Sequence, residues 1–310
     1  MPVLTKEKIF IVGVCWLVSG SLLFLVIDLL APTTSLASGT PTVDTIVVST
    51  TTPATTNVSA IDLNEAANRA VYISGQISHQ DGCSVLASNG LSAVFYRTGV
   101  SGAQACSVDN LNCYQVNQAQ GACAIIGCTG TETTVSYQCV VQVKHYADAT
   151  DTGAYINETW RAYAQIIDQN QLSGNNSIAT EINSLSSLDI VGGVDFGSLN
   201  LGTTSTVSLP LVLANRGNTT IDLRLSGTGL TCANGGVIPV EKQRYDLSSD
   251  TAYESMFSVS SSLDTINLNL DKQTSGTTSS KNLYFRLAMP PNGLRGACGG
   301  SVIILAVNDA

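Results

Sequence analysis

At 310 residues the chain is long enough for two domains of ordinary size. Only 12% of its residues are charged, and the net charge is −9. Because a thinly charged acidic surface repels phosphate backbones, this composition excludes nucleic acid as a partner.

Near the N-terminus, Lys6 and Lys8 precede a stretch from Ile9 to Ile27 that carries no charge. A helix of this length, at about 1.5 Å per residue, would cross a bilayer core. The lysines predict that this end stays in the cytoplasm and that the rest of the chain is exported. We interpret residues 1–30 as a signal peptide or an N-terminal membrane anchor. Cleavage after Ala37 and an uncleaved anchor both remain open.

The next segment, residues 31–65, is rich in Thr, Ser and Pro, most of all up to residue 59. This composition has no sustained hydrophobic period, so it predicts an extended linker that forms no packed core. Such a linker would hold the folded part of the chain away from the membrane.

Residues 66–185 show the alternation of apolar and polar side chains that is typical of strands. The clearest run extends from Val135 to His145, and a second run begins at Trp160. Gly, Asn and Asp separate the predicted strands, which favours an antiparallel β-sandwich. The segment DTGAYINETWRAYAQIIDQN resembles the closing strand pair of polycystic-kidney-disease-type and related bacterial Ig-like domains.

Residues 186–310 show the same alternation on both sides of a turn at residues 215–218, which predicts a β-hairpin. The segment VDFGSLNLGTTSTVSLPLVLANRGNTTIDLRLSG resembles the opening of Hydin-type, abnormal-spindle-like Ig domains of bacterial surface proteins. The matching positions are Asp195, Phe196, Gly197, Gly202, Asn215, Gly217 and Asn218. The resemblance implies a role in packing and display. The predicted fold is therefore all-β: two tandem Ig-like antiparallel β-sandwiches behind an N-terminal hydrophobic helix and a linker.

Apart from Cys15, which lies in the apolar stretch, the cysteines form a group of six and a group of two. Even groups behind an export signal predict disulfides made in an oxidising compartment. Six cysteines allow fifteen connectivities. Short sequence separations favour Cys106–Cys113 and Cys123–Cys128, which leaves Cys83 for Cys139, while Cys232 and Cys298 share the second domain. A zinc cluster is the rival interpretation, but no C-x-x-C spacing supports it.

Few residues in the sequence indicate a catalytic or metal-binding site. The chain has two histidines, His79 and His145, and lacks the motifs of serine hydrolases, metalloproteases and phosphate-binding loops. Asp148 and Asp151 could offer oxygens to calcium, but two carboxylates fall short of the six to eight ligands that calcium takes. We therefore predict no catalytic residue, no metal site and no cofactor.

These features predict a non-catalytic protein that is secreted or displayed on the cell surface, in adhesion or in the assembly of an envelope layer or filament. Its partners would be other surface proteins or further copies of itself, bound through sandwich edges, and the membrane if the N-terminal segment is uncleaved. The alternative is a module that binds carbohydrate or another small ligand, although aromatic residues make up only 6% of the chain. An enzyme without a recognisable motif is the third possibility.

Overall fold

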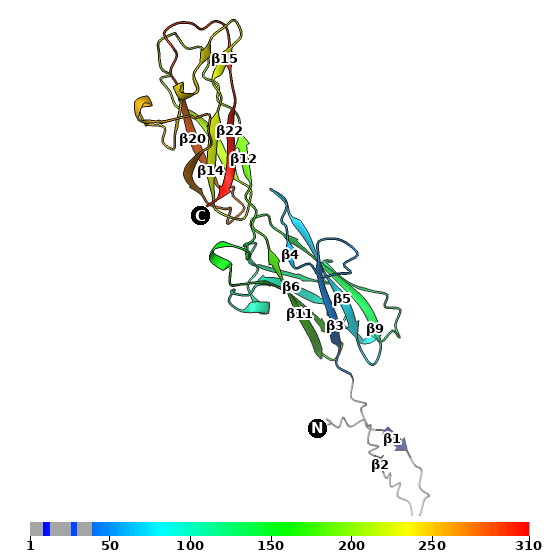
Figure 1. Cartoon of the computed structure of the whole chain (residues 1–310). Coiled ribbons are helices and arrows are strands. Elements are labelled where there is room, and N and C mark those ends of the chain that lie inside the picture. The colour runs from blue at the N-terminus through cyan, green and yellow to red at the C-terminus, as the bar shows by residue number, and fades with distance from the viewer. Residues whose placement is uncertain (1–8, 13–25, 30–38, 310) are drawn as a thin grey trace, which may run out of the picture.

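The computed structural model describes residues 9–12, 26–29 and 39–309, and strands form most of the regular structure there. The predicted all-β class is confirmed, because the helices among these residues are short 3₁₀ turns. Figure 1 shows two groups of strands that follow one another along an elongated molecule. The 3₁₀ turns are η1 (Cys83–Val85), η2 (Ala103–Ala105), η3 (Gly153–Tyr155), η4 (Val240–Lys242) and η5 (Tyr253–Ser255).

The first sandwich has two sheets, with strand orders β4-β11-β10-β6-β7 and β3-β5-β9-β8. Apolar side chains from both sheets fill the space between them. The rings of Phe95 and Trp160 stack within this core, with centroids 4.8 Å apart. The strands are β3 (Thr42–Ser49), β4 (Ala60–Ile61), β5 (Arg69–Ser78), β6 (Ser92–Arg97), β7 (Cys113–Asn117), β8 (Cys123–Ile126), β9 (Thr134–Val143), β10 (Trp160–Ile167) and β11 (Ser173–Ile182).

The second sandwich has a separate core between a sheet of order β12-β13-β20-β17-β18 and a sheet of order β19-β14-β22. A small third sheet, β16-β15-β21, lies at one end. The predicted hairpin is wrong: β13 and β14 flank the turn at residues 215–218, but they enter opposite sheets and pair with other strands instead of with each other. The strands are β12 (Leu188–Val191), β13 (Leu209–Asn215), β14 (Ile221–Gly227), β15 (Leu230–Cys232), β16 (Val237–Ile238), β17 (Gln243–Asp246), β18 (Phe257–Ser258), β19 (Asp264–Leu270), β20 (Ser280–Leu287), β21 (Cys298–Gly299) and β22 (Val302–Asn308).

The linker predicted for residues 31–65 is wrong over much of its length. Strand β3 pairs with β5, and Val43 and Val48 are buried in the core of the first sandwich. Ile61 is also fully buried, in β4. The run TVDTIVVS places buried residues on one face of a strand, and Thr has a high strand propensity as well as a high frequency in linkers. Composition alone therefore misled the prediction.

The helix predicted for Ile9–Ile27 is wrong for its described residues. Strands β1 (Ile9–Val12) and β2 (Val26–Leu29) pair with each other in antiparallel fashion. Both contain Ile and Val, whose branched side chains favour strands. Among the described residues, no helix is long and apolar enough to cross a membrane. Cys15 and the proposed cleavage position Ala37 lie outside those residues.

Four disulfides join the eight cysteines between residues 39 and 309. The predicted pairs Cys106–Cys113 and Cys232–Cys298 are confirmed. The other two predicted pairs are wrong, because the bonds are Cys83–Cys128 and Cys123–Cys139. Cys123 and Cys139 lie opposite each other on the neighbouring strands β8 and β9. The register of the sheet, rather than sequence separation, therefore selects the partner.

Candidate interaction site

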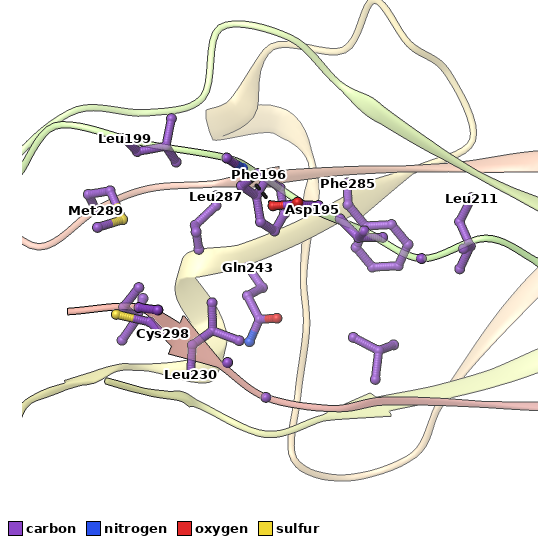
Figure 2. Close-up of a pocket in the computed structure, with 18 of the residues that line it drawn as sticks. Asp195, Phe196, Leu199, Leu211, Leu230, Gln243, Phe285, Leu287, Met289 and Cys298 are labelled. Carbon is purple, nitrogen blue, oxygen red and sulfur yellow. Dashed lines mark hydrogen bonds between the residues drawn. The ribbon is translucent and has the colours of Figure 1, made fainter. Parts of the chain in front are cut away.

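A groove of about 780 Å³ lies between the two sheets of the second sandwich. Strands β12, β13 and β20 supply residues to one side, and β22 supplies Val302 and Ile304 to the other. Most of its lining side chains are aliphatic or aromatic. Figure 2 shows Phe285, Leu287 and Gln243 directed into the same space. The groove therefore gives access to the apolar interior of the sandwich.

One wall of the groove is the turn after β12 that carries Asp195, Phe196 and Gly197. The Asp195 side chain accepts a hydrogen bond from the backbone nitrogen of Gly197 at 2.8 Å. Gly197 has a φ of 62°, a backbone conformation that favours glycine. This turn lets Phe196 pack against the core. Residues that the sequence singled out for their family resemblance thus form part of the groove.

Gln243 and a disulfide also contribute to the lining of the groove. Gln243 is buried and donates from its side-chain nitrogen to the backbone oxygen of Thr228 at 2.7 Å. The Cys232–Cys298 disulfide joins β15 to β21, and Cys298 lines the groove. A buried hydrogen bond therefore fixes Gln243, and a covalent bond fixes Cys298.

Two edge strands, β12 and β22, border the groove. Within the part of the chain that the structure describes, each pairs with one neighbour only, so one side of its backbone faces outward. Both carry exposed apolar side chains: Ile190 and Val191 on β12, with 40% and 55% of their surface exposed, and Ile303 and Leu305 on β22, with 52% and 45%. Exposed apolar edges of this kind are ready-made surfaces for pairing with another strand.

Asp148, which the sequence offered as a source of calcium ligands, instead lies in a buried ion-pair cluster. It accepts a hydrogen bond from Arg97 Nε at 3.0 Å and another from Lys272 of the second sandwich. Arg97 also pairs with Glu158, and its guanidinium carbon lies 3.6 Å from the centre of the Tyr155 ring. Each charge in the cluster has an opposite partner, so the arrangement is suited to holding structure together.

His145 and Asp151 lie near the same junction and also have structural surroundings. His145 is buried, and this burial is the main cause that lowers its pKa below the usual value, with Arg216 and Lys144 lowering it further. The Asp151 carboxylate accepts a hydrogen bond from the backbone nitrogen of Ser184 at 2.8 Å. The structure does not bring His145, Asp148 and Asp151 into a common cavity with the groove residues.

The remaining residues that could act in catalysis or bind a metal also have partners within the fold. His79 Nε2 lies 3.5 Å from the Asp168 carboxylate, and both side chains are fully buried. Asp168 in turn accepts backbone hydrogen bonds from Asn170 and Leu172, which shape a turn. The atoms of Cys83, Cys128 and Glu132 are close enough to suggest a metal site. The two sulfurs, however, form a disulfide and are not thiolate ligands.

The sequence prediction missed the groove, although one signal for it was present. The last strand, VIILAVN, has apolar residues at both odd and even positions, whereas a strand with one solvated face alternates. A continuous apolar run indicates apolar surroundings on both faces of a strand, whereas within one chain Ile303 and Leu305 on the outer face of β22 are about half exposed. The other groove residues come from distant parts of the sequence, and only the topology brings them together.

Comparisons with known proteins give little guidance. No family description and no curated sequence matches the chain. A search of solved structures finds a secreted serine protease, VesC from Vibrio cholerae, with 11% sequence identity and a TM-score of 0.19. The match covers 81% of this chain and 49% of the protease chain, so the chain spans about half of that protein's length. A similarity of this size carries no argument about fold or activity.

Proposed function

We propose that the chain is a non-catalytic structural or interaction protein of the extracellular space or cell surface. It binds protein partners through the edges of its second sandwich, in adhesion or in envelope or filament assembly. The four disulfides support an oxidising environment, because such bonds persist outside the reducing cytosol. The apolar stretch near the N-terminus would direct export, as a cleaved signal or as an anchor.

The observation that carries this proposal is the groove with its two apolar edge strands. A strand added beside β22 would form main-chain hydrogen bonds with the outward side of β22 and would direct alternate side chains into the groove. Leu211, Phe285 and Leu287 would provide apolar contacts for those side chains. Recognition of this kind needs no catalytic residue. It uses main-chain bonds for affinity and the groove for selectivity.

The groove also favours a second candidate function, the binding of a small ligand. Its volume of about 780 Å³ lies in the range of small-molecule sites, and its apolar lining with one buried amide, Gln243, is typical of them. This lining suits an apolar ligand better than a carbohydrate, since sugars are commonly held by exposed aromatic faces and several polar groups. A carbohydrate ligand is therefore the weaker form of this alternative.

Paired substitutions test the proposal. Leu199 lines the groove, whereas Leu201 is exposed two residues further on and is not among the lining residues. The full-length protein should be accessible to labelling on intact cells. It should support cell attachment or association, and Leu199→Glu should weaken this activity while Leu201→Glu leaves it unchanged. Thermal unfolding of both variants checks that they are folded. Turnover of a substrate that depends on Asp148, Asp151 or His145, in variants that remain folded, would overturn the proposal.

A further inference from the structure

The outer face of the β19-β14-β22 sheet is polar except on its last strand. Outward residues of β19 include Thr265 and Asn267, and β14 presents Arg224. On β22 the corresponding positions are Ile303 and Leu305, which are about half exposed. Their neighbours across the sheet are Ser226 and Arg224, so neither has an apolar partner on β14. The apolar outer face is therefore confined to the edge strand.

The hydrogen bonds at the ends of β22 show which backbone groups face outward. Thr228 donates to the backbone oxygen of Ser301 at 2.9 Å, and Asp309 donates to that of Thr220 at 3.2 Å. In an antiparallel pair, directly bonded residues alternate with residues whose groups point away. Thr220 and Thr228 flank β14, so the odd-numbered residues from 301 to 309 are the ones bonded to that strand. The even-numbered residues Val302, Ile304 and Ala306 therefore direct their N–H and C=O groups to the open edge.

The β22 edge also lacks the features that protect exposed strands. Natural edges are commonly guarded by charged side chains, proline or bulges. Strand β22, VIILAVN, contains none of the charged residues and no proline, and its pairing with β14 is regular. The opposite edge strand of the same sheet, β19, begins with Asp264 and has an irregular register. An uncharged edge can meet an identical edge without repulsion, even though the chain carries a net charge of −9.

We propose that β22 pairs with β22 of a second copy of the chain, in an antiparallel two-fold arrangement centred on Ile304. This inference rests on the proposed function and names the partner. In this register Ile304 faces Ile304 of the second copy, and Val302 faces its Ala306. These are the residues whose backbone groups point outward, so they would exchange hydrogen bonds across the two-fold axis. The two β19-β14-β22 sheets would become one continuous sheet.

The same register explains the apolar outer face. Ile303 of one copy lies opposite Leu305 of the other, at a position where the side chains of antiparallel strands come closest. Two such pairs form, one on each side of the axis, and each covers side chains whose neighbours on β14 are polar. On the inner face, Val302, Ile304 and Ala306 of the second copy extend the apolar surface at the mouth of the groove. A second copy therefore matches both faces of β22 and its backbone.

Sedimentation of the full-length, disulfide-bonded protein over a range of concentrations tests this inference. The wild type should form a dimer. Ile303→Lys and Leu305→Lys should raise the dimer dissociation constant by at least about tenfold, because each places charges in an apolar cross-strand pair. Asn267→Lys, at an exposed position on the outer face of β19, is the matched control and should leave the constant unchanged. Both β22 side chains are exposed within one chain, so at concentrations where the wild type is also monomeric the variants should match its melting temperature.

A second substitution tests the backbone contact separately. Ala306→Pro removes an N–H that faces the open edge, so it should weaken the dimer without breaking the β14–β22 pairing. A wild type that stays monomeric, or a dimer weakened by Asn267→Lys but not by Leu305→Lys, would overturn the inference. If a monomeric chain attaches to cells and Leu305→Lys abolishes this, the partner is another protein. That result would contradict pairing with a second copy but would agree with the proposed function.

Discussion

Lys272, in the loop after β19, donates a hydrogen bond to the carboxylate of Asp148 in the first sandwich. It also donates to the backbone oxygen of Tyr146 at 3.3 Å. A second contact lies at the same junction. The Asn218 side chain accepts a hydrogen bond from the backbone nitrogen of Leu185 at 2.6 Å. Asn218 belongs to the turn between β13 and β14, and this side chain thus links the turn to the chain segment between the sandwiches. Charged and neutral hydrogen bonds therefore hold the junction together.

The two partners of this ion pair should contribute unequally to stability. Asp148→Ala leaves Arg97 and Lys272 without their shared carboxylate in a largely buried site, so the free energy of unfolding should fall by about 3–5 kcal/mol. Lys272→Ala leaves Asp148 paired with Arg97 and should cost about 1 kcal/mol. Urea unfolding of both variants measures the difference. Equal small losses would show that the cluster does not support the fold.

His145 should make stability depend on pH. Burial lowers the pKa of its side chain in the folded protein, whereas the unfolded chain takes up the proton near the ordinary value of about 6.5. The unfolded state therefore binds more protons as the pH falls. The contribution of the neutral side chain is fully present above about pH 6.5 and is lost as the pH falls through the lower folded-state pKa. His145→Gln, unfolded in urea at about pH 7.5 and pH 5, should lose less stability than the wild type; equal losses would contradict this assignment.

The disulfides should differ in the stability that they confer. On the chain-entropy model, the Cys232–Cys298 bond, with a sequence separation of 66, contributes about 4 kcal/mol, and the Cys106–Cys113 bond, with a separation of 7, about 2.5 kcal/mol. Replacing each pair by serines and comparing thermal unfolding measures both values.

Peptide mapping without reduction should recover Cys83 with Cys128 and Cys123 with Cys139. Recovery of Cys83 with Cys139 would instead support the pairing by sequence separation.

Regular alternation made the all-β class predictable, and strands β9 and β10 show this most clearly. Their buried residues, among them Tyr137 and Trp160, fall at every second position of the sequence. Disulfide pairing was less predictable, because Cys123 meets Cys139 through the register of β8 against β9. Sequence separation contains no information about register. Without the sheet topology, sequence assigned the isolated pair Cys232–Cys298 and the short loop Cys106–Cys113 correctly, but not the other two pairs.

The candidate site was less visible in the sequence than the fold. Phe196 and Gly197 were recognised as a motif, but nothing in the motif shows that Phe196 lies in a wall shared with Leu230 and Phe285. Conversely, Asp148 and His145 are residue types that commonly bind metals or act in catalysis. In the structure Asp148 forms buried ion pairs and His145 is buried. A groove depends on which strands lie at the edges of the sheets, and that is a property of the topology.

The correction to the predicted linker gives a last test, because it assigns a structural role to residues that composition had placed in a tether. Val48 of β3 is fully buried in the core of the first sandwich. Val48→Ala should therefore lower the free energy of unfolding by about 2 kcal/mol, since it removes two methyl groups from packed surroundings. Thr55→Ala, at an exposed position in the same segment, is the control and should change stability by less than about 0.5 kcal/mol. Urea unfolding of the two variants would contradict the assignment of β3 to the core if both proved neutral.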